Sequence, residues 1–449
     1  MSRRFAISIL LVLVCVCAQA RTRPHYGGTL HVETAGDPWR VPDGIARRLV
    51  FDGLTEFDAN GNAAPALAIE WKSDDNDHRW QFQLRPGVQF QDGSPLTPDA
   101  VVMSLNLSCA ANCPWTAVRA VGSQVVFLGD SAMPNLPALL ASSDYLIALT
   151  RTADGQTPSN PIGTGPFQYT SLNSGVLTLT ANDHGWQARP FLDAMTITAN
   201  RPIRDQWLDL GLGRADVVDV PAQELRQAEQ QHLTLVVSPP VKLLALQVSD
   251  SGALVNPVLR AAIAQAVDRS ALFNVIFQKQ GEIAAGLLPQ SLTGYAFLFP
   301  ADRDVSKANE LRGGLTPPPL TLAADSDGTM QLAAQRIALN LHEAGFNVQV
   351  MNTRNGPHTD LVLRILPLVG ADPAAALEAL LRSAGENVSV PAQNPVALYR
   401  AEHDFLELKM LIPLLDLPRA NAIGSRVRDF RLCADGTPDL ADVSLEGAE

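Results

Sequence analysis

Three cysteines beyond the first twenty residues carry the side chains with the clearest chemical options. Cys109 and Cys113 flank an Ala-Ala-Asn loop, and Cys433 stands alone far along the chain. Thiols this close can form a local disulfide in an oxidising compartment, or they can supply two ligands to a metal. A zinc site needs further ligands, yet the histidines are scattered singly and no His-x-x-x-His pair occurs. We therefore expect a Cys109–Cys113 disulfide, no metal, and Cys433 as a buried free thiol.

Sequence motifs of hydrolytic enzymes are absent. The chain has no Gly-x-Ser-x-Gly, His-Glu-x-x-His or Ser-x-x-Lys pattern. A triad assembled from distant residues leaves no such pattern, so a hydrolase stays as a less favoured alternative. Gly163 and Gly165 could belong to a phosphate loop, but no lysine and no helix pattern follow them, which favours a tight backbone turn. We expect no enzyme activity and no cofactor.

The first residues have the pattern of an export signal. Arg3 and Arg4 precede an apolar run over residues 5–17, and an Ala-Gln-Ala triplet ends at Ala20. The run is shorter than the roughly 20 residues that span a bilayer, which favours a cleaved signal over a membrane anchor. Valines precede both cysteines of this run where lipoprotein signals carry a small residue, so lipid anchoring is the weaker alternative. We expect residues 1–20 to be removed and the protein to be periplasmic.

Composition limits the class of partner. The chain of 449 residues has 34 basic and 46 acidic side chains, a formal charge of -12, which becomes -14 when two arginines leave with the signal. A surface this acidic makes nucleic acid an unexpected partner. Helix and strand patterns recur throughout, and no second long apolar segment occurs. We expect a mixed α/β protein large enough for two or three lobes.

One segment shows how local elements are specified. Trp80, Phe82 and Leu84 alternate with glutamines, which predicts a strand with one buried face. Arg85-Pro-Gly87 then predicts a turn, because proline restricts φ and glycine tolerates positive φ. Thr97 is a candidate N-cap with proline and aspartate in the following turn, so a helix is expected over 98–107.

The second half of the chain has further start and stop signals for helices. Asn256 is expected to cap a helix that begins at Pro257, and Ser270 to cap the next one. A strand, helix and strand then follow, with Gly345 as the C-cap of the helix, which predicts a βαβ unit. The expected ranges of this unit are 320–323, 330–343 and 346–350.

Taken together, these segments resemble the extracellular solute-binding proteins of family 5, the peptide- and nickel-binding class that serves ABC importers. The resemblance extends over nearly the whole mature chain. The matching features are Gly53-Leu54, Pro65 to Ala68, Trp71 with the acidic turn after it, Arg85-Pro-Gly87, Leu96 to Ala100, Gly163-Thr-Gly-Pro-Phe167, and Asp268-Arg269.

The resemblance implies an α/β protein with the two-lobed periplasmic-binding-protein-like fold, type II, in the cluster with an extra subdomain. Its mixed sheets are expected to be flanked by helices. The implied domain ranges are a signal peptide over 1–20, the start of lobe I over 21–48, an extra subdomain of lobe I over 49–155, lobe I continued over 156–240, lobe II over 241–410, and a return to lobe I over 411–449.

The resemblance also indicates where a ligand would bind. The loop after the expected strand at 29–32 offers Glu33 as a charge, Thr34, and Trp39 as a flat apolar wall, although a tryptophan there can equally be a packing residue. Arg364 could meet a carboxylate, and Leu366 lies in the same cleft-lining segment.

That second segment departs from the family pattern. Ile365 and Leu366 replace a Gly-Trp pair, and Val369 stands where many members carry the acid that pairs with a peptide's amino terminus. A buried ammonium needs an opposite charge or full hydrogen bonding, and valine offers neither. We therefore expect Val369 in a ligand site whose solute need not be a standard peptide. Asp372 is expected to cap a helix over 374–382 rather than to touch the ligand.

The function that the resemblance implies is capture of a peptide-like or other small solute by lobe closure and its delivery to an ABC permease, by a periplasmic protein that acts as a monomer. The departures around Val369 keep one alternative open, a diverged binding scaffold or sensor module without transport. A hydrolase is the less favoured third option.

Overall fold

The computed structural model describes residues 25–447 with short gaps. The expected export signal and Val369 lie outside the described residues. Within the described part, no helix is long and apolar enough to cross a membrane. The gaps are residues 41–43, 59, 75, 110–112, 153, 295–298, 300, 326–327, 353–358, 369–371, 384, 386–389 and 391–393.

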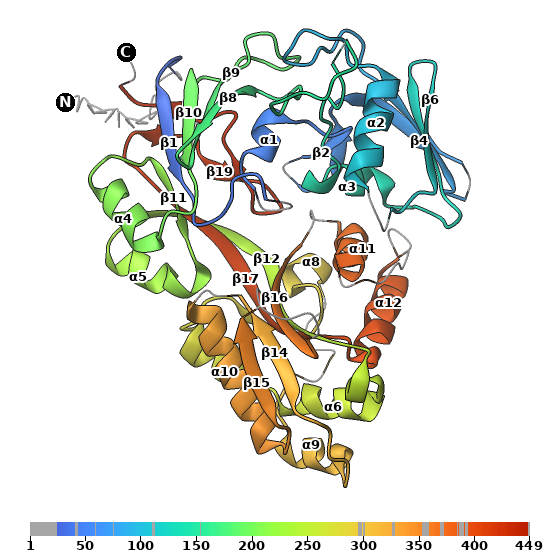
Figure 1. The fold of residues 1–449 in the computed structure, drawn as a ribbon. Coiled ribbons are helices and arrows are strands. Elements are labelled where there is room, and N and C mark those ends of the chain that lie inside the picture. Colours follow the sequence, from blue (N-terminus) through green and yellow to red (C-terminus); the bar gives the residue numbers. More distant parts are fainter. Residues whose placement is uncertain are drawn as a thin grey trace, which may run out of the picture.

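A mixed sheet of 11 strands runs through the whole molecule (Figure 1). Its order is β15-β14-β16-β12-β17-β11-β1-β10-β9-β8, and β13 pairs with β17. The strands are β1 (Thr29–Glu33), β8 (Phe167–Asn173), β9 (Val176–Ala181), β10 (Ala194–Thr198), β11 (Val217–Val220), β12 (Thr234–Val248), β13 (Glu282–Ile283), β14 (Leu320–Ala324), β15 (Val348–Asn352), β16 (Leu361–Pro367) and β17 (Leu411–Ile423).

Two long strands join the upper and lower groups of elements in Figure 1. β12 and β17 are antiparallel to each other along most of their length. Their register is irregular around Pro240, because a proline has no N–H to donate to the ladder. The molecule therefore has two lobes connected by a paired-strand crossing, as expected from the sequence.

The upper lobe is built on β1, which is parallel to both β10 and β11. Helix α1 (Arg47–Val50) packs on this sheet, and α4 (Ile203–Gly211) and α5 (Leu225–Gln230) lie beside β11. Gly163 lies in the tight backbone segment that the sequence predicts, and a Cβ atom at this position would lie 2.0 Å from the carbonyl oxygen of Val50. The glycines at this turn thus allow two backbone segments to approach closely.

A separate four-stranded sheet forms the extra part of the upper lobe. Its order is β4-β5-β7-β6, and Phe82 on β5 packs edge-on against Phe127 on β7. The predicted strand, turn and helix of this segment are confirmed. The elements are β4 (Ala68–Ser73), β5 (Arg79–Leu84), β6 (Ala117–Val121), β7 (Gln124–Leu128), α2 (Pro98–Ser108) and α3 (Leu136–Leu140).

The expected disulfide closes the far end of α2. Cys109, the C-cap of the helix, is bonded to Cys113, with their Cα atoms 5.6 Å apart. Cys433 is free and half-buried, and burial raises the pKa of its thiol to about 11. The prediction of a local pairing is therefore confirmed.

The lower lobe carries helices on both faces of its part of the sheet. The predicted βαβ unit is present, with β14 and β15 parallel and Gly345 at positive φ after the helix between them. One face is covered by α6 (Pro257–Ala266), α7 (Arg269–Ala271), α9 (Val305–Arg312) and α10 (Gly328–Glu343), and the other by α8 (Gln290–Thr293), α11 (Pro373–Ser383) and α12 (Pro395–Leu408).

Two helix starts in this lobe test the capping predictions. The side chain of Asn256 accepts a hydrogen bond from the Val258 N–H, as expected. The prediction for Ser270 is wrong, because the Oδ1 atom of Asp268 accepts from the Ala271 N–H at 2.8 Å and Ser270 lies inside the helix. Asp268 has the extended backbone of an N-cap, and aspartate caps at least as well as serine.

The remaining elements are short. Near the C-terminus two small hairpins pack beside β1, and the guanidinium of Arg426 binds both carboxylate oxygens of Asp216, which precedes β11. The two hairpins near the C-terminus are β18 (Val427–Arg428) with β21 (Ser444–Leu445) and β19 (Arg431–Leu432) with β20 (Pro438–Asp439). A third strand pair, β2 (Thr55–Phe57) with β3 (Ala63–Pro65), lies near α1. Short helical segments are Ser143–Tyr145, Ala222–Glu224, Gly252–Val255 and Leu272–Ile276.

Candidate functional site

A cavity of about 550 Å³ lies where the upper lobe meets the long strands. Its upper wall comes from the loops that follow β1, β10 and β11, and its lower wall from β12, β16 and β17. The carboxyl ends of parallel strands meet at one edge of a sheet, which is why these three loops converge. The lining residues are 34–38, 40, 45, 200–203, 219–224, 242, 365 and 417–420.

Asp219 holds the upper wall together. Its Oδ2 atom accepts a hydrogen bond from the Ala35 N–H at 2.9 Å, which ties the loop after β1 to the end of β11. The Asp219 N–H in turn donates to the side chain of Gln206 on α4, and the Trp207 indole donates to the Asp219 carbonyl oxygen. These bonds position the loop backbone before any ligand arrives.

Arg201 sits at the edge of the cavity among acidic groups. Its guanidinium binds Asp209, and its Nε atom lies 3.7 Å from the Oε2 atom of Glu33. Burial raises the pKa of Glu33, and the charge of Asp209 raises it further, while Arg201 lowers it. The positive charge of Arg201 is therefore largely neutralised by carboxylates of the protein itself.

Other charges line the cavity directly. Arg40 is exposed and forms no ion pair among the described residues, and Lys242 and Arg419 project from β12 and β17. Asp37 and Glu224 add negative charge on the upper side. Apolar walls with a few charges of both signs suit a small zwitterionic or anionic solute. The apolar walls are Ile45, Ile203, Val220, Ile365 and Leu417 together with the prolines at 38, 202, 221 and 418.

The three candidates in the loop after β1 have different surroundings. Thr34 lines the cavity, and its hydroxyl donates to the Gly36 carbonyl oxygen at 2.8 Å. Glu33 faces Arg201 just behind the wall, and its Oε2 atom is buried without a hydrogen-bond partner. Trp39 packs against Phe51, with ring centroids 6.1 Å apart, in the core of the upper lobe.

The two candidates on β16, Arg364 and Leu366, also have different surroundings. Side chains along a strand alternate between the two faces of the sheet. Leu366 is only 3% exposed and belongs to the core beneath α11 and α12. The Arg364 guanidinium donates to the Gln247 side chain at 2.7 Å and does not line the cavity. Ile365, between them, is 40% exposed and lines it. Asp372 caps α11 through the Ala375 N–H, as predicted.

Most cavity residues were missed by sequence reasoning. Arg40, Lys242 and Arg419 lie far apart in the chain, and each resembles an ordinary surface cation in its local context. The usable signal was positional, because Asn200-Arg-Pro202 lies just after β10 and Asp219-Val-Pro221 forms the end of β11 and the residue after it. Strand ends of an α/β sheet are where ligands bind.

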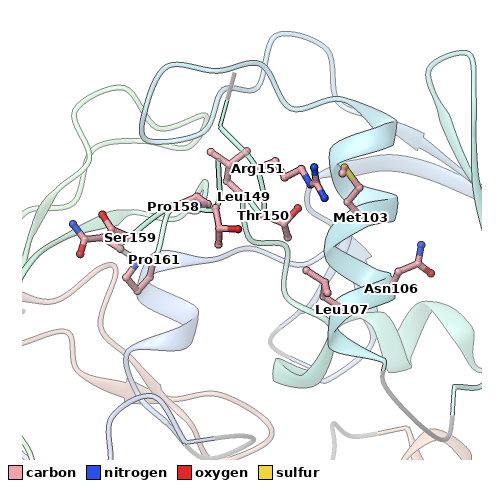
Figure 2. A pocket seen from close by; sticks show the side chains of 11 residues that line it. Met103, Asn106, Leu107, Leu149, Thr150, Arg151, Pro158, Ser159 and Pro161 are labelled. Carbon is pink, nitrogen blue, oxygen red and sulfur yellow. The ribbon is translucent and has the colours of Figure 1, made fainter. Parts of the chain in front are cut away.

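A second hollow of about 800 Å³ lies on the outside of the extra subdomain, between α2 and the segment 149–161 (Figure 2). Figure 2 shows Met103 and Leu107 on the α2 side and Arg151 on the other. It is lined by one lobe only, so lobe motion would not enclose a ligand there. No cluster of three or more metal-ligating side chains occurs in the described part of the chain.

The fold and the cavity together define a class, a two-lobed protein with a cavity of small-molecule size at the junction of its lobes. Comparison with known proteins supplies the family. Residues 62–385 match the family model for bacterial extracellular solute-binding proteins, family 5 (middle region), and the chain belongs to this family.

Individual relatives have low sequence identity to this chain, but the alignments with them are long. The probable di/tripeptide-binding protein 5 of Pseudomonas aeruginosa is 25% identical over 366 residues, which cover 69% of each chain. Di/tripeptide-binding protein 2 of the same organism is 24% identical over an alignment of 536 residues that covers 99% of both chains. The fold is similar to that of the periplasmic binding protein DppA of Helicobacter pylori in complex with a peptide, with a TM-score of 0.79, 19% identity, and coverage of 94% of this chain and 99% of the other.

Proposed function

We propose that this protein captures a small solute in the interlobe cavity by closure of its two lobes and delivers it to an ABC permease. The observation that supports the proposal best is the composition of the cavity wall. Both the strand-end loops of the upper lobe and the strands β12, β16 and β17 contribute to it. A ligand held between two lobes stabilises the closed arrangement, because it gains contacts with both.

The nature of the wall suggests the class of solute. The volume of about 550 Å³ lies within the usual range for small-molecule sites, and the lining mixes apolar side chains with charges of both signs. A di- or tripeptide or an amino-acid derivative carries both charges on a compact body and fits this lining. The names of the two Pseudomonas relatives, which refer to di- and tripeptides, are consistent with that class.

We further propose the arrangement of the chain that this function requires. The signal would be cleaved after Ala20, and the periplasmic chain would act as a monomer without covalent chemistry. Lobe I would comprise residues 21–48, 156–240 and 411–449, with the extra subdomain at 49–155 and lobe II at 241–410. The change of lobe then falls within β12 and within β17, since the first residues of β17 still pack in the core of the lower lobe. Bending near Pro240 and Pro418, which pair with each other, would move one lobe against the other.

Native mass spectrometry of the protein purified from its own periplasm tests the function directly. A stoichiometric small-molecule adduct, identified after denaturation, is the expected result. An empty protein that also shows no thermal shift with peptide, metal or sugar panels would favour a diverged scaffold or sensor module instead.

A matched pair of variants then tests the site. Ile365→Trp should fill the cavity and lower adduct occupancy or affinity by more than about tenfold, because an added indole displaces the solute. Leu208→Trp, at an exposed position of α4 outside the cavity, should leave binding unchanged. Equal binding by both variants would place the solute elsewhere.

A further inference from the structure

A smaller charged cavity lies within the lower lobe, separate from the solute cavity. Its volume is about 290 Å³, and it lies between α6, the end of α12 and the start of β17. Ala264, Ala285, Leu406 and Ile412 give it an apolar wall. No residue lines both cavities. A ligand here would therefore be additional to the captured solute.

The most unusual group in this cavity is the guanidinium of Arg269, which is only 6% exposed. Its Nε atom donates to the Pro413 carbonyl oxygen at 2.7 Å and its Nη1 atom to the Ala301 carbonyl oxygen at 3.1 Å. Its Nη2 atom has no hydrogen bond, and Arg269 has no ion pair, within the part of the chain that the structure describes.

This environment compensates the buried positive charge only in part, through the carboxylate of Asp302 and without an ion pair among the described residues. Burial lowers the pKa of Arg269 to about 10, so the side chain still carries its charge at neutral pH. Two neutral carbonyl oxygens satisfy two donors but do not balance the charge, and a buried charge is costly unless it is paired. An anion in the cavity would supply both the missing charge and acceptors for Nη2.

The cavity as a whole has more positive than negative groups, three against two. Lys307 on α9 and Lys409 after α12 line it together with Arg269, against Asp302 and Glu407. Lys409 and Glu407 pair with each other at 3.4 Å, and Asp302 is exposed. Asp302 stabilises the charge of Arg269 less than burial destabilises it. The excess of positive charge therefore comes from the buried Arg269, and it favours an anion inside the cavity.

We propose that this cavity is a second binding site, specific for a small aliphatic carboxylate. The carboxylate accepts hydrogen bonds from Arg269 Nη2, with Lys307 at the rim, and the short alkyl chain lies against the alanine, leucine and isoleucine wall. The volume of about 290 Å³ is at the lower end for ligand sites, which fits a molecule of a few carbon atoms. The proposal does not depend on the identity of the captured solute.

The test uses butyrate as the probe and the methyl NMR signal of Ile412, a residue of this cavity alone. Saturable shifts of that signal at or below about 10 mM butyrate are expected, an affinity typical of a small fragment. Inorganic phosphate, which has no apolar part, should bind more weakly. No saturable shift with butyrate, or tighter binding of phosphate than of butyrate, would overturn the proposal.

Two variants with matched controls locate the site. Ala264→Leu fills the cavity and should abolish butyrate binding, whereas Val258→Leu on the same helix lies outside the cavity and should not change it. Lys307→Ala should weaken binding by about two- to fivefold, an effect of the size expected for an exposed charge, and the exposed Lys279→Ala should have no effect. Binding that survives Ala264→Leu would exclude this cavity.

Arg269→Gln tests the central group itself. It should eliminate binding while circular dichroism and thermal unfolding show a folded protein. Because loss of the bond to Pro413 can also unfold the lobe, the Ala264→Leu and Lys307→Ala variants, which keep Arg269, decide the outcome if Arg269→Gln does not fold.

Discussion

Among individual residues, Asp416 on β17 is an acid whose burial has an energetic consequence that can be tested. It is 4% exposed, and its Oδ1 atom has no hydrogen-bond partner among the residues that the structure describes. The pKa of Asp416 is raised to about 8. Burial is the main cause, and the nearby charges of Glu282 and Glu402 contribute the rest. The carboxyl group is therefore protonated in the folded protein at neutral pH.

This protonation makes stability depend on pH. Between about pH 4 and pH 8 the folded state binds a proton that the unfolded state has lost, so the free energy of unfolding falls as pH rises, by up to about 1.4 kcal/mol per pH unit. Asp416→Asn cannot ionise and should lose this dependence. Urea unfolding at pH 5, 6.5 and 8 should show the advantage of the variant over the natural protein growing with pH.

The exposed Asp250→Asn provides the control for a general effect of charge removal. Its unfolding free energy should follow that of the natural protein at every pH. Parallel pH profiles for Asp416→Asn and the natural protein would show that Asp416 is ionised in the fold.

Among the elements, α2 shows how both ends of one helix are secured. At its start the Thr97 hydroxyl oxygen accepts a hydrogen bond from the Ala100 N–H at 3.2 Å, and Pro98 occupies the first helical position. At its end Cys109 is both the C-cap and one half of the disulfide. All of these local features were predictable, because each involves residues within a few positions of one another.

The cap leads to a prediction for stability. Thr97→Ala removes the acceptor for the Ala100 N–H and should lower the free energy of unfolding by about 1 kcal/mol, whereas Thr97→Ser keeps the hydroxyl and should cost little. Chemical denaturation measures this loss, provided that the dependence of the unfolding free energy on denaturant concentration is unchanged in the variants. An equal loss in both variants would point to the threonine methyl group instead of the cap.

At the scale of the whole molecule, a buried contact links the extra subdomain to the lower lobe. Asn135, before α3, donates from Nδ2 to the Glu378 Oε1 atom on α11 at 3.0 Å and to the Val390 carbonyl oxygen at 2.9 Å. In Figure 1 α11 lies just below α3, and the two helices are in contact. The same Oε1 atom accepts from the Val390 N–H within the lower lobe, so only the two bonds from Asn135 depend on the lobes being together.

Removing this contact should favour the open arrangement. Asn135→Ala eliminates two hydrogen bonds, and a loss of about 1 to 1.5 kcal/mol would shift the closed-to-open ratio by about five- to tenfold. Small-angle X-ray scattering of the ligand-free protein should then give a larger radius of gyration than the natural protein. The exposed Asn106→Ala on α2 should not change it. An unchanged radius in Asn135→Ala would show that the contact does not hold the lobes together.

The interlobe cavity shows where sequence reasoning reached its limit. Thr34 was identified through the resemblance and lines the cavity, whereas Ile365 was noted only as a departure from the family pattern and its neighbours Arg364 and Leu366 were preferred. A shift of one position along a strand reverses the face of the sheet, so an approximate alignment is not enough to identify a lining residue. The prediction for Val369 stays a prediction.

The sequence by itself determined the family, the two-lobed class of fold and the local elements, because turns, caps and the alternation of a strand depend on neighbouring residues. Asp268 in place of Ser270 shows that even a cap can move when two good candidates stand close together. Only the tertiary structure decided which charges meet. Arg40, Lys242 and Arg419 come together in one cavity, and Arg269 is buried against the carbonyl oxygen of Pro413 without an ion pair among the described residues. Long-range strand pairing brings these segments together, and nothing in the sequence next to each residue indicates its distant neighbours.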